Sequence, residues 1–257
     1  MQKLLFLLTF LGVTLSAQAQ LRYIPADSII AWDNDAVNLR NTALQACPGL
    51  RPHHISAPLS QLKALKSDWG KCLQESNASP TPFTYAHRFT LAARLLTLTA
   101  DAQYARDMER LIYGPLLEAT LSPDLSAEKV TAAQSLLNAV GTMLATKGDT
   151  LYVNYYANST STIPHRDDNY QLDLITGMPF HQRVKFRFSR IELPQGVPST
   201  IAIRLPQGDW NDTNFPIYCN GHETPYRVEL GYALITNMWR TGYEIYFDLP
   251  QPLLEER

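Results

Sequence analysis

Cysteine and histidine are the residues of this sequence that could bind a metal, and their spacing decides whether they do. The chain contains three cysteines and six histidines. Cys47, Cys72 and Cys219 lie far apart, and no Cys-x-x-Cys or His-Glu-x-x-His pattern occurs. His53 and His54 are adjacent in a proline-bounded loop, where we expect solvated side chains that point in different directions. The sequence therefore predicts no metal site and no cofactor.

Carboxylates could instead serve acid–base chemistry, because a glycosidase works with a pair of Asp or Glu residues. The helical half of the chain offers Asp68, Glu75, Asp107, Glu109 and Glu118. Most of them, Glu109 in particular, have the sequence context of surface charges. Glu118 follows two leucines near a predicted helix end and is a candidate for substrate binding. No pair can be chosen by spacing, so we predict no catalytic residue.

His87 and Trp210 are two further candidates for substrate binding. His87 lies in the middle of a predicted helix beside Arg88, where a helix-surface histidine is the structural alternative. Trp210 lies beside Asp209 in a predicted turn. Sugar sites often use aromatic faces, whereas the structural alternative is a packing residue at a strand end.

Several function classes are excluded by missing motifs and by the charge balance. No Gly-x-Gly-x-x-Gly or Walker loop is present, so nucleotide binding has no support. A serine hydrolase would need a Gly-x-Ser-x-Gly elbow, which is also missing. The 22 Lys and Arg residues against 24 Asp and Glu give a net charge of −2. Because nucleic-acid binding usually shows as a basic excess, we expect no nucleic-acid partner.

The N-terminus has the order of a secretory signal peptide. Lys3 supplies the positive start, residues 4–13 are almost wholly apolar, and residues 17–19 place small side chains where a signal peptidase recognises them. This apolar run is shorter than the roughly 20 residues that span a bilayer, and no other segment is apolar enough. We expect cleavage after this triplet, no remaining transmembrane segment, and a secreted or periplasmic protein. Disulfides persist there, so Cys47 and Cys72 either pair or remain buried thiols.

The period of the apolar residues changes near residue 147. In residues 27–147 they recur every three or four positions, which is typical of helices, and Asp101 and Ser126 have the type and position of helix N-caps. In residues 150–250 short segments such as 184–188 alternate between apolar and polar side chains, which indicates an antiparallel β-sandwich. We therefore expect an α+β multidomain protein: a signal peptide at 1–19, a helical domain at 20–147 and a β-sandwich domain at 148–257.

Blocks of sequence in both halves resemble the β-L-arabinofuranosidase-type glycoside hydrolases of family 127. In the helical half the resemblance is carried by Ala92–Ala105 and Met108–Tyr113. In the strand half it is carried, in order, by Leu151-Tyr152-Val153-Asn154, Ile203-Arg204-Leu205-Pro206 with Trp210, Asn220-Gly221, Gly231-Tyr232, Trp239 and Asp248-Leu249-Pro250. The order and spacing of these blocks are more specific than any one of them.

The resemblance implies an (α/α)₆ catalytic barrel followed by β-sandwich domains, with a zinc-bound cysteine nucleophile. This sequence departs from that pattern at the ligand positions. Residues 81–84 stand where the family has a glutamate and a cysteine, and Ala127-Glu128 stand where it has paired cysteines. The helical half is also too short for a complete barrel at roughly 11–12 residues per helix. We therefore expect a partial barrel-like array and transfer no catalytic residue.

The resulting expectation is a secreted glycoside-hydrolase-like protein that binds carbohydrate or assists in glycan use without catalysis. One alternative is an active glycoside hydrolase on arabinofuranoside-type substrates. The other is a structural accessory subunit that docks on another cell-envelope protein.

Overall fold

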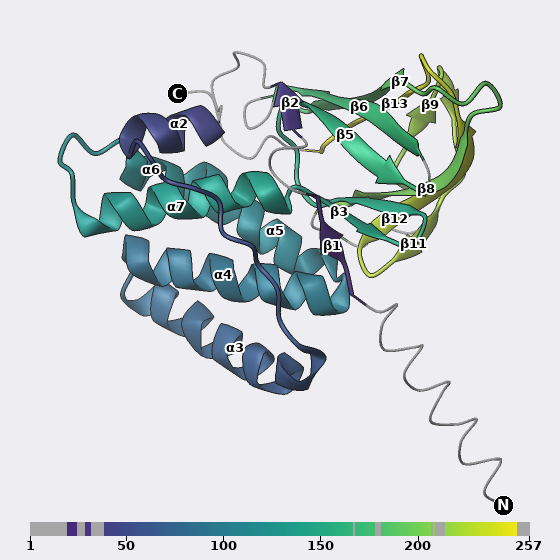
Figure 1. The fold of residues 1–257 in the computed structure, drawn as a ribbon. Coiled ribbons are helices and arrows are strands. Elements are labelled where there is room, and N and C mark those ends of the chain that lie inside the picture. Colours follow the sequence, from purple (N-terminus) through teal and green to yellow (C-terminus); the bar gives the residue numbers. More distant parts are fainter. Residues whose placement is uncertain are drawn as a thin grey trace, which may run out of the picture.

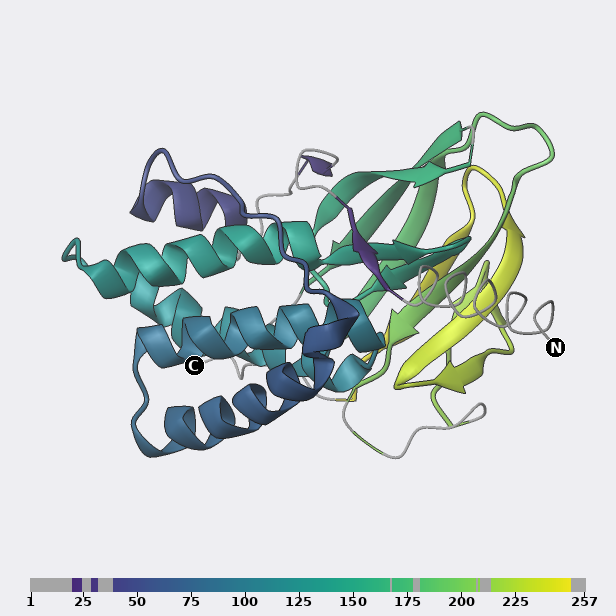
Figure 2. The same cartoon turned by 60° about the horizontal axis from the view of Figure 1, so that its bottom comes forward.

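The computed structural model describes residues 20–24, 29–31, 39–166, 168–177, 181–206, 208 and 214–250. Its helices gather on one side of the molecule and its strands on the other (Figure 1, and from a second side Figure 2). The predicted signal peptide and Trp210 lie outside the described residues.

The helical side is built from helices whose ends the structure defines. These are α2 (Leu39–Ala46), α3 (Leu62–Ala78), α4 (Pro82–Thr99), α5 (Ala102–Leu111), α6 (Leu117–Thr120) and α7 (Ala127–Thr142), with a 3-10 turn at Leu59–Gln61 and a π turn at Ile112–Leu116. The predicted caps are confirmed: Asp101 accepts a hydrogen bond from the Gln103 amide, and Ser126 from the Lys129 amide. Thr81 and Thr84 form a reciprocal capping box before α4.

Two sheets make up the other side. The six-stranded sheet has the order β1 (Arg22–Tyr23), β3 (Leu144–Lys147), β4 (Thr150–Val153), β8 (Val197–Arg204), β12 (Tyr232–Trp239) and β11 (Arg227–Glu229). The seven-stranded sheet has the order β10 (His222–Glu223), β9 (Tyr218–Cys219), β13 (Glu244–Asp248), β7 (Arg183–Arg190), β6 (Asp168–Thr176), β5 (Ser159–His165) and β2 (Ile29–Ala31). The predicted alternation is confirmed on β7, where Val184, Phe186 and Phe188 are buried.

The strand pairing differs from the expectation in two respects. The ladders are antiparallel except between β4 and β8, which run parallel with Leu151 opposite Ile201. In addition, β1, β2 and β3 come from the part of the chain that we predicted to be helical. The helical pattern predicted for residues 27–147 is wrong at Ile29–Ala31, because this segment pairs with β5 more than a hundred residues away. Tertiary pairing overrides the local pattern here.

The two sheets pack against one another through aromatic side chains. Phe188 of β7 stacks on Trp239 of β12 with ring centroids 4.7 Å apart, and both side chains are fully buried. The ring of Tyr156, from the loop after β4, packs edge-on against that of Phe247 of β13, with ring centroids 5.6 Å apart. Such rings bury large apolar areas, so they are a main source of stability between the sheets.

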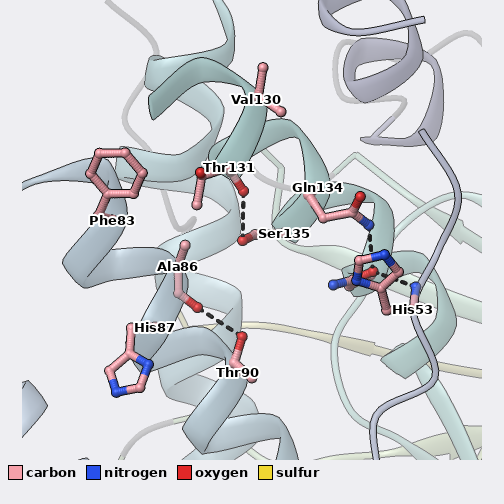
Figure 3. Close-up of a pocket in the computed structure, with 10 residues that line it drawn as sticks. His53, Phe83, Ala86, His87, Thr90, Val130, Thr131, Gln134 and Ser135 are labelled. Atoms are coloured by element: carbon pink, nitrogen blue, oxygen red, sulfur yellow. Dashed lines mark hydrogen bonds between the residues drawn. The ribbon is translucent and has the colours of Figure 1, made fainter. Parts of the chain in front are cut away.

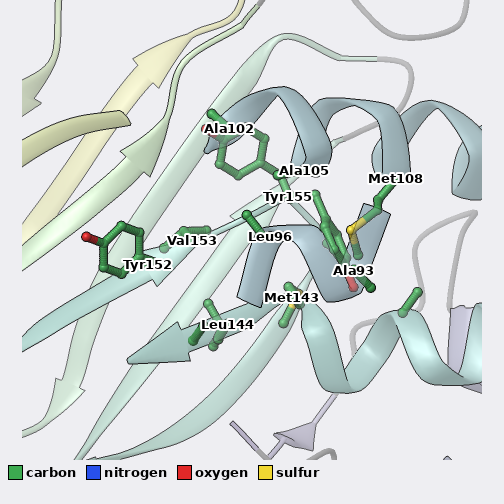
Figure 4. Close-up of a cluster of buried hydrophobic side chains, with 14 of the residues drawn as sticks. Ala93, Leu96, Ala102, Ala105, Met108, Met143, Leu144, Tyr152, Val153 and Tyr155 are labelled. Carbon is green, nitrogen blue, oxygen red and sulfur yellow. The ribbon is translucent and has the colours of Figure 1, made fainter. Parts of the chain in front are cut away.

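The helices and the six-stranded sheet share one apolar core. In Figure 4 side chains of α4 and α5, such as Leu96 and Met108, meet Met143 and the strand residues Leu144 and Val153. Residues 21–23, which precede the helices in the sequence, lie along this contact between the helices and the sheet. There the amide of Leu21 donates to the Thr97 carbonyl, and the Tyr23 hydroxyl donates to the Ala93 carbonyl at 2.6 Å.

A buried ion pair also joins the helices to the six-stranded sheet. Arg204 of β8 donates through Nη2 to Oε2 of Glu109 on α5 at 2.5 Å, and both side chains are 3% exposed. The second oxygen of Glu109 accepts from the Tyr156 amide at 3.3 Å. The Arg204 guanidinium also lies over the Tyr156 ring. Burial works against its charge, but Glu109, Tyr156 and Tyr232 outweigh that effect and raise the pKa of Arg204.

We predict that Glu109→Gln lowers the free energy of unfolding by about 3–5 kcal/mol, because it leaves the Arg204 cation buried without a counter-charge. Asp248→Asn is the control, since the Arg183–Asp248 pair is 60% and 53% exposed, and should change stability by less than about 1 kcal/mol. Urea unfolding measures the free energy of unfolding of both variants, and unchanged m values show that the comparison is valid. Equal losses in the two variants would contradict a special role for the buried pair.

The turn between β11 and β12 allows a separate test of the helix–sheet contact. Gly231 has a φ of +80°, and a Cβ there would lie 2.8 Å from the Cβ of Ala102 on α5. Gly242 also has a positive φ of +88°, but a Cβ there meets nothing within 4 Å. We expect Gly231→Ala to destabilise the protein by about 1–3 kcal/mol more than Gly242→Ala, because overpacking adds to the shared backbone strain. Thermal unfolding of the two variants measures the difference, and similar shifts in Tm would refute the close packing.

Candidate functional site

An open cavity of about 450 Å³ lies between α4 and α7. Both helices present residues at i, i+3, i+4 and i+7, the spacing of one helix face. The described residues that line it are Phe83, Ala86, His87 and Thr90 of α4, Val130, Thr131, Gln134, Ser135 and Asn138 of α7, and His53. In Figure 3 the α4 and α7 residues form opposite sides, and His53 lies at the Gln134 end.

The segment before α3 forms the third wall of the cavity. Gln134 donates from Nε2 to the Arg51 carbonyl at 2.8 Å, and the His53 amide donates to Oδ1 of Asn138 at 2.8 Å. Ile55 and Ala57 are buried and anchor the segment further along. The two amide side chains of α7 therefore fix the position of His53.

A buried polar network positions α4 from its other side. Arg88 donates from Nε to Oδ2 of Asp107 on α5 at 2.9 Å, and from Nη1 to the Ser76 hydroxyl of α3 at 3.1 Å. Trp69 of α3 also donates to Asp107, at 3.2 Å. Three helices are thus joined next to His87. The network also shows that the expectation of a surface charge was wrong for Asp107, which is 7% exposed.

The structure separates the three predicted substrate-binding candidates. His87 lines the cavity and is exposed. Glu118 is exposed on α6 and is not among the described lining residues. Trp210 lies outside the described residues, so its role stays a prediction. The expectation for Glu109 is wrong: it is 2% exposed because Arg204, far away in sequence, pairs with it.

Sequence reasoning missed most of the lining. His53 is exposed, as expected for a loop, but it also lines the cavity. The signal that could have found the α7 side is its polar stripe of Thr131, Gln134 and Asn138. These residues follow helical spacing within a helix whose other positions are largely buried and apolar.

The cysteines are free thiols in the structure. Cys47 and Cys72 are buried, which is the alternative to the disulfide, and Cys219 is half-buried on β9. Burial, followed by the charge of Glu75, raises the pKa of the Cys72 thiol. In the described part of the chain, no three His, Cys, Asp or Glu side chains are grouped as metal ligands. Among its helices, none has the length and apolarity that a bilayer span requires.

Comparison with known proteins shows which family part of the chain resembles. Residues 150–251 match the family model "Beta-L-arabinofuranosidase, GH127 middle domain". The predicted resemblance to GH127 is therefore confirmed. No curated protein matches the chain in a sequence search.

Solved structures extend the likeness beyond the matched segment. A GH127 beta-arabinofuranosidase has a TM-score of 0.54 at 20% identity over 65% of this chain and 32% of its own. A protein described as a glycoside hydrolase gives 0.55 at 18% identity over the same shares. The GH127 beta-L-arabinofuranosidase of Geobacillus stearothermophilus T6 gives 0.50 at 18% identity, over 62% of this chain and 30% of its own. The chain thus spans about a third of the length of these proteins, and at these identities they show the fold.

We predict that Asn138→Ala releases the cavity wall at His53. The His53 amide loses its acceptor, and a net hydrogen-bond contribution of about 1 kcal/mol corresponds to roughly fivefold faster amide exchange. Hydrogen exchange followed by NMR measures this rate. Asn220→Ala is the control, because Oδ1 of Asn220 accepts from the Glu244 amide on the far sheet. Unchanged exchange at His53 in Asn138→Ala would contradict the assigned wall.

Proposed function

We propose that this protein is a carbohydrate-binding relative of the GH127 glycoside hydrolases and holds a sugar in the cavity between α4 and α7 without cleaving it. The chemistry of the cavity lining carries the proposal. Sugars present many hydroxyls together with apolar C–H faces, and sites for small polar molecules combine apolar surface with a few placed hydrogen-bonding groups. Here Phe83 is 47% exposed beside the amide, hydroxyl and imidazole groups of both helices.

The lining groups favour binding over hydrolysis. Glycosidic cleavage by the common route uses two carboxyl groups that face each other across the scissile bond. The described lining residues of this cavity are neutral amides, hydroxyls, imidazoles and apolar side chains. The match of residues 150–251 to a glycoside hydrolase family supports carbohydrate as the ligand class.

The proposal also includes the detailed architecture and the cellular location of the protein. We take the helices as a partial α/α-barrel array and the two packed sheets as a β-sandwich, with a domain boundary near residue 147. We take residues 1–19 as a signal peptide and the mature protein as secreted or periplasmic.

An accessory subunit of a cell-envelope complex is a second candidate function. The observation in its favour is the connection between α6 and α7, where Leu121 is 69% and Leu125 is 76% exposed. Exposed apolar side chains that lie together often mark an interaction surface. A photo-crosslinking residue at position 125, in the cell envelope of the native host, tests this candidate. A specific adduct that is absent for a probe at the exposed Lys71 would support it, and no adduct would refute it.

We expect calorimetric titration with neutral arabinose-containing oligosaccharides to show saturable binding. Phe83→Ala should weaken it by about fivefold, because an aromatic contact contributes roughly 1 kcal/mol. Leu121→Ala is the control, since it removes an exposed apolar side chain outside the lining.

The same preparations are assayed for hydrolysis of an aryl β-L-arabinofuranoside with added zinc. We expect no turnover. Turnover with stoichiometric bound zinc would contradict the non-catalytic proposal and support the active glycoside hydrolase. The absence of binding to any glycan would instead refute carbohydrate recognition.

A further inference from the structure

The described lining contains three hydroxyl groups, and each donates its proton to a main-chain carbonyl. Thr90 donates to the Ala86 carbonyl at 3.0 Å, Thr131 to the Ala127 carbonyl at 2.8 Å, and Ser135 to the Thr131 carbonyl at 3.0 Å. Dashed lines in Figure 3 mark two of these bonds, at Thr90 and Ser135. A hydroxyl has one donor and two acceptor lone pairs. All three therefore face a ligand as acceptors.

The two amide side chains, Gln134 and Asn138, differ in which of their polar groups remain available to a ligand. Gln134 uses its Nε2 group for the Arg51 carbonyl and for Oδ1 of Asn138, the latter at 3.0 Å, so its Oε1 is left as an acceptor. Oδ1 of Asn138 accepts from both Gln134 and the His53 amide. Nδ2 of Asn138 is thus the side-chain amide donor that remains in the described lining.

Other donor groups that commonly hold anions are few in the described lining. Helix N-termini bind anions through their first amides. Thr81 caps the start of α4 and Ser126 the start of α7, each by accepting from an amide of the first turn. The described lining includes no Lys or Arg, and a neutral imidazole offers one donor and one acceptor. Among the side chains of the described lining, acceptors therefore outnumber donors.

From this balance we infer that the cavity selects neutral, hydroxyl-rich sugars and rejects acidic ones such as uronates and sulfated sugars. The inference rests on the proposed function and names its ligand class. A neutral sugar supplies a proton from each hydroxyl to the Thr90, Thr131, Ser135 and Gln134 oxygens. A carboxylate or sulfate supplies only acceptors, so it would face these oxygens without a shared proton and lose its hydration.

Calorimetric titration with a neutral oligosaccharide and with its uronic-acid counterpart of equal length tests the inference. Both are measured in the same buffer at pH 8. We expect the neutral sugar to bind at least tenfold more tightly. Equal or tighter binding of the uronate would overturn this inference and leave carbohydrate binding intact. No binding of either sugar would refute the proposed function and the inference with it.

A matched pair of variants tests whether the hydroxyl acceptors are responsible. Thr90 and Thr99 both lie on α4 and donate to a carbonyl four residues earlier, Thr99 to Leu95 at 2.8 Å, but only Thr90 is among the described lining residues. Thr90→Val should weaken the neutral sugar about fivefold, whereas Thr99→Val should leave its affinity unchanged. Equal thermal stability of the two variants checks the fold. Unchanged neutral-sugar affinity in a folded Thr90→Val protein would overturn the role of this acceptor.

Discussion

The ion pair between Glu109 and Arg204 is the constraint on which the arrangement of helices and sheets depends. It joins the last turn of α5 to the end of β8, where both side chains are buried. Two buried charges are stable only when each has its partner and its hydrogen bonds. The pair therefore fixes both the rotation of α5 about its own axis and its position along the sheet. The Tyr113 hydroxyl, which donates to the Tyr156 carbonyl at 2.5 Å, fixes the next helical turn in the same way.

This fixed position of α5 extends to the cavity through α4. Asp107, two residues before Glu109 on α5, binds Arg88 of α4. Arg88 directly follows His87, which lines the cavity. Packing of α4 on α7 then sets the width between the two polar stripes. The α4 side of the cavity is therefore held by a largely buried ion pair, which suits a preorganised binding site more than a surface that must order on binding.

Local features of this fold follow from the sequence, and long-range ones do not. The N-caps at Asp101 and Ser126 and the alternation along β7 depend on neighbouring residues, and the structure has them as expected. The burial of Glu109 depends on a partner 95 residues away. Strand β2 likewise depends on its pairing with β5. At the cavity, His87 was a candidate by type, whereas Gln134 and Asn138 gain meaning only when α7 is placed beside α4 and the Arg51–His53 segment.

We propose above that a neutral sugar binds between α4 and α7 and leaves intact. The most direct measurement is an NMR titration of the protein with a neutral arabinose-containing oligosaccharide, followed by mass spectrometry of the recovered sugar. We expect saturable shifts of the His87, Gln134 and Asn138 signals and an unchanged sugar. Shifts confined to other surfaces, or shortened oligosaccharide in the recovered sample, would contradict it.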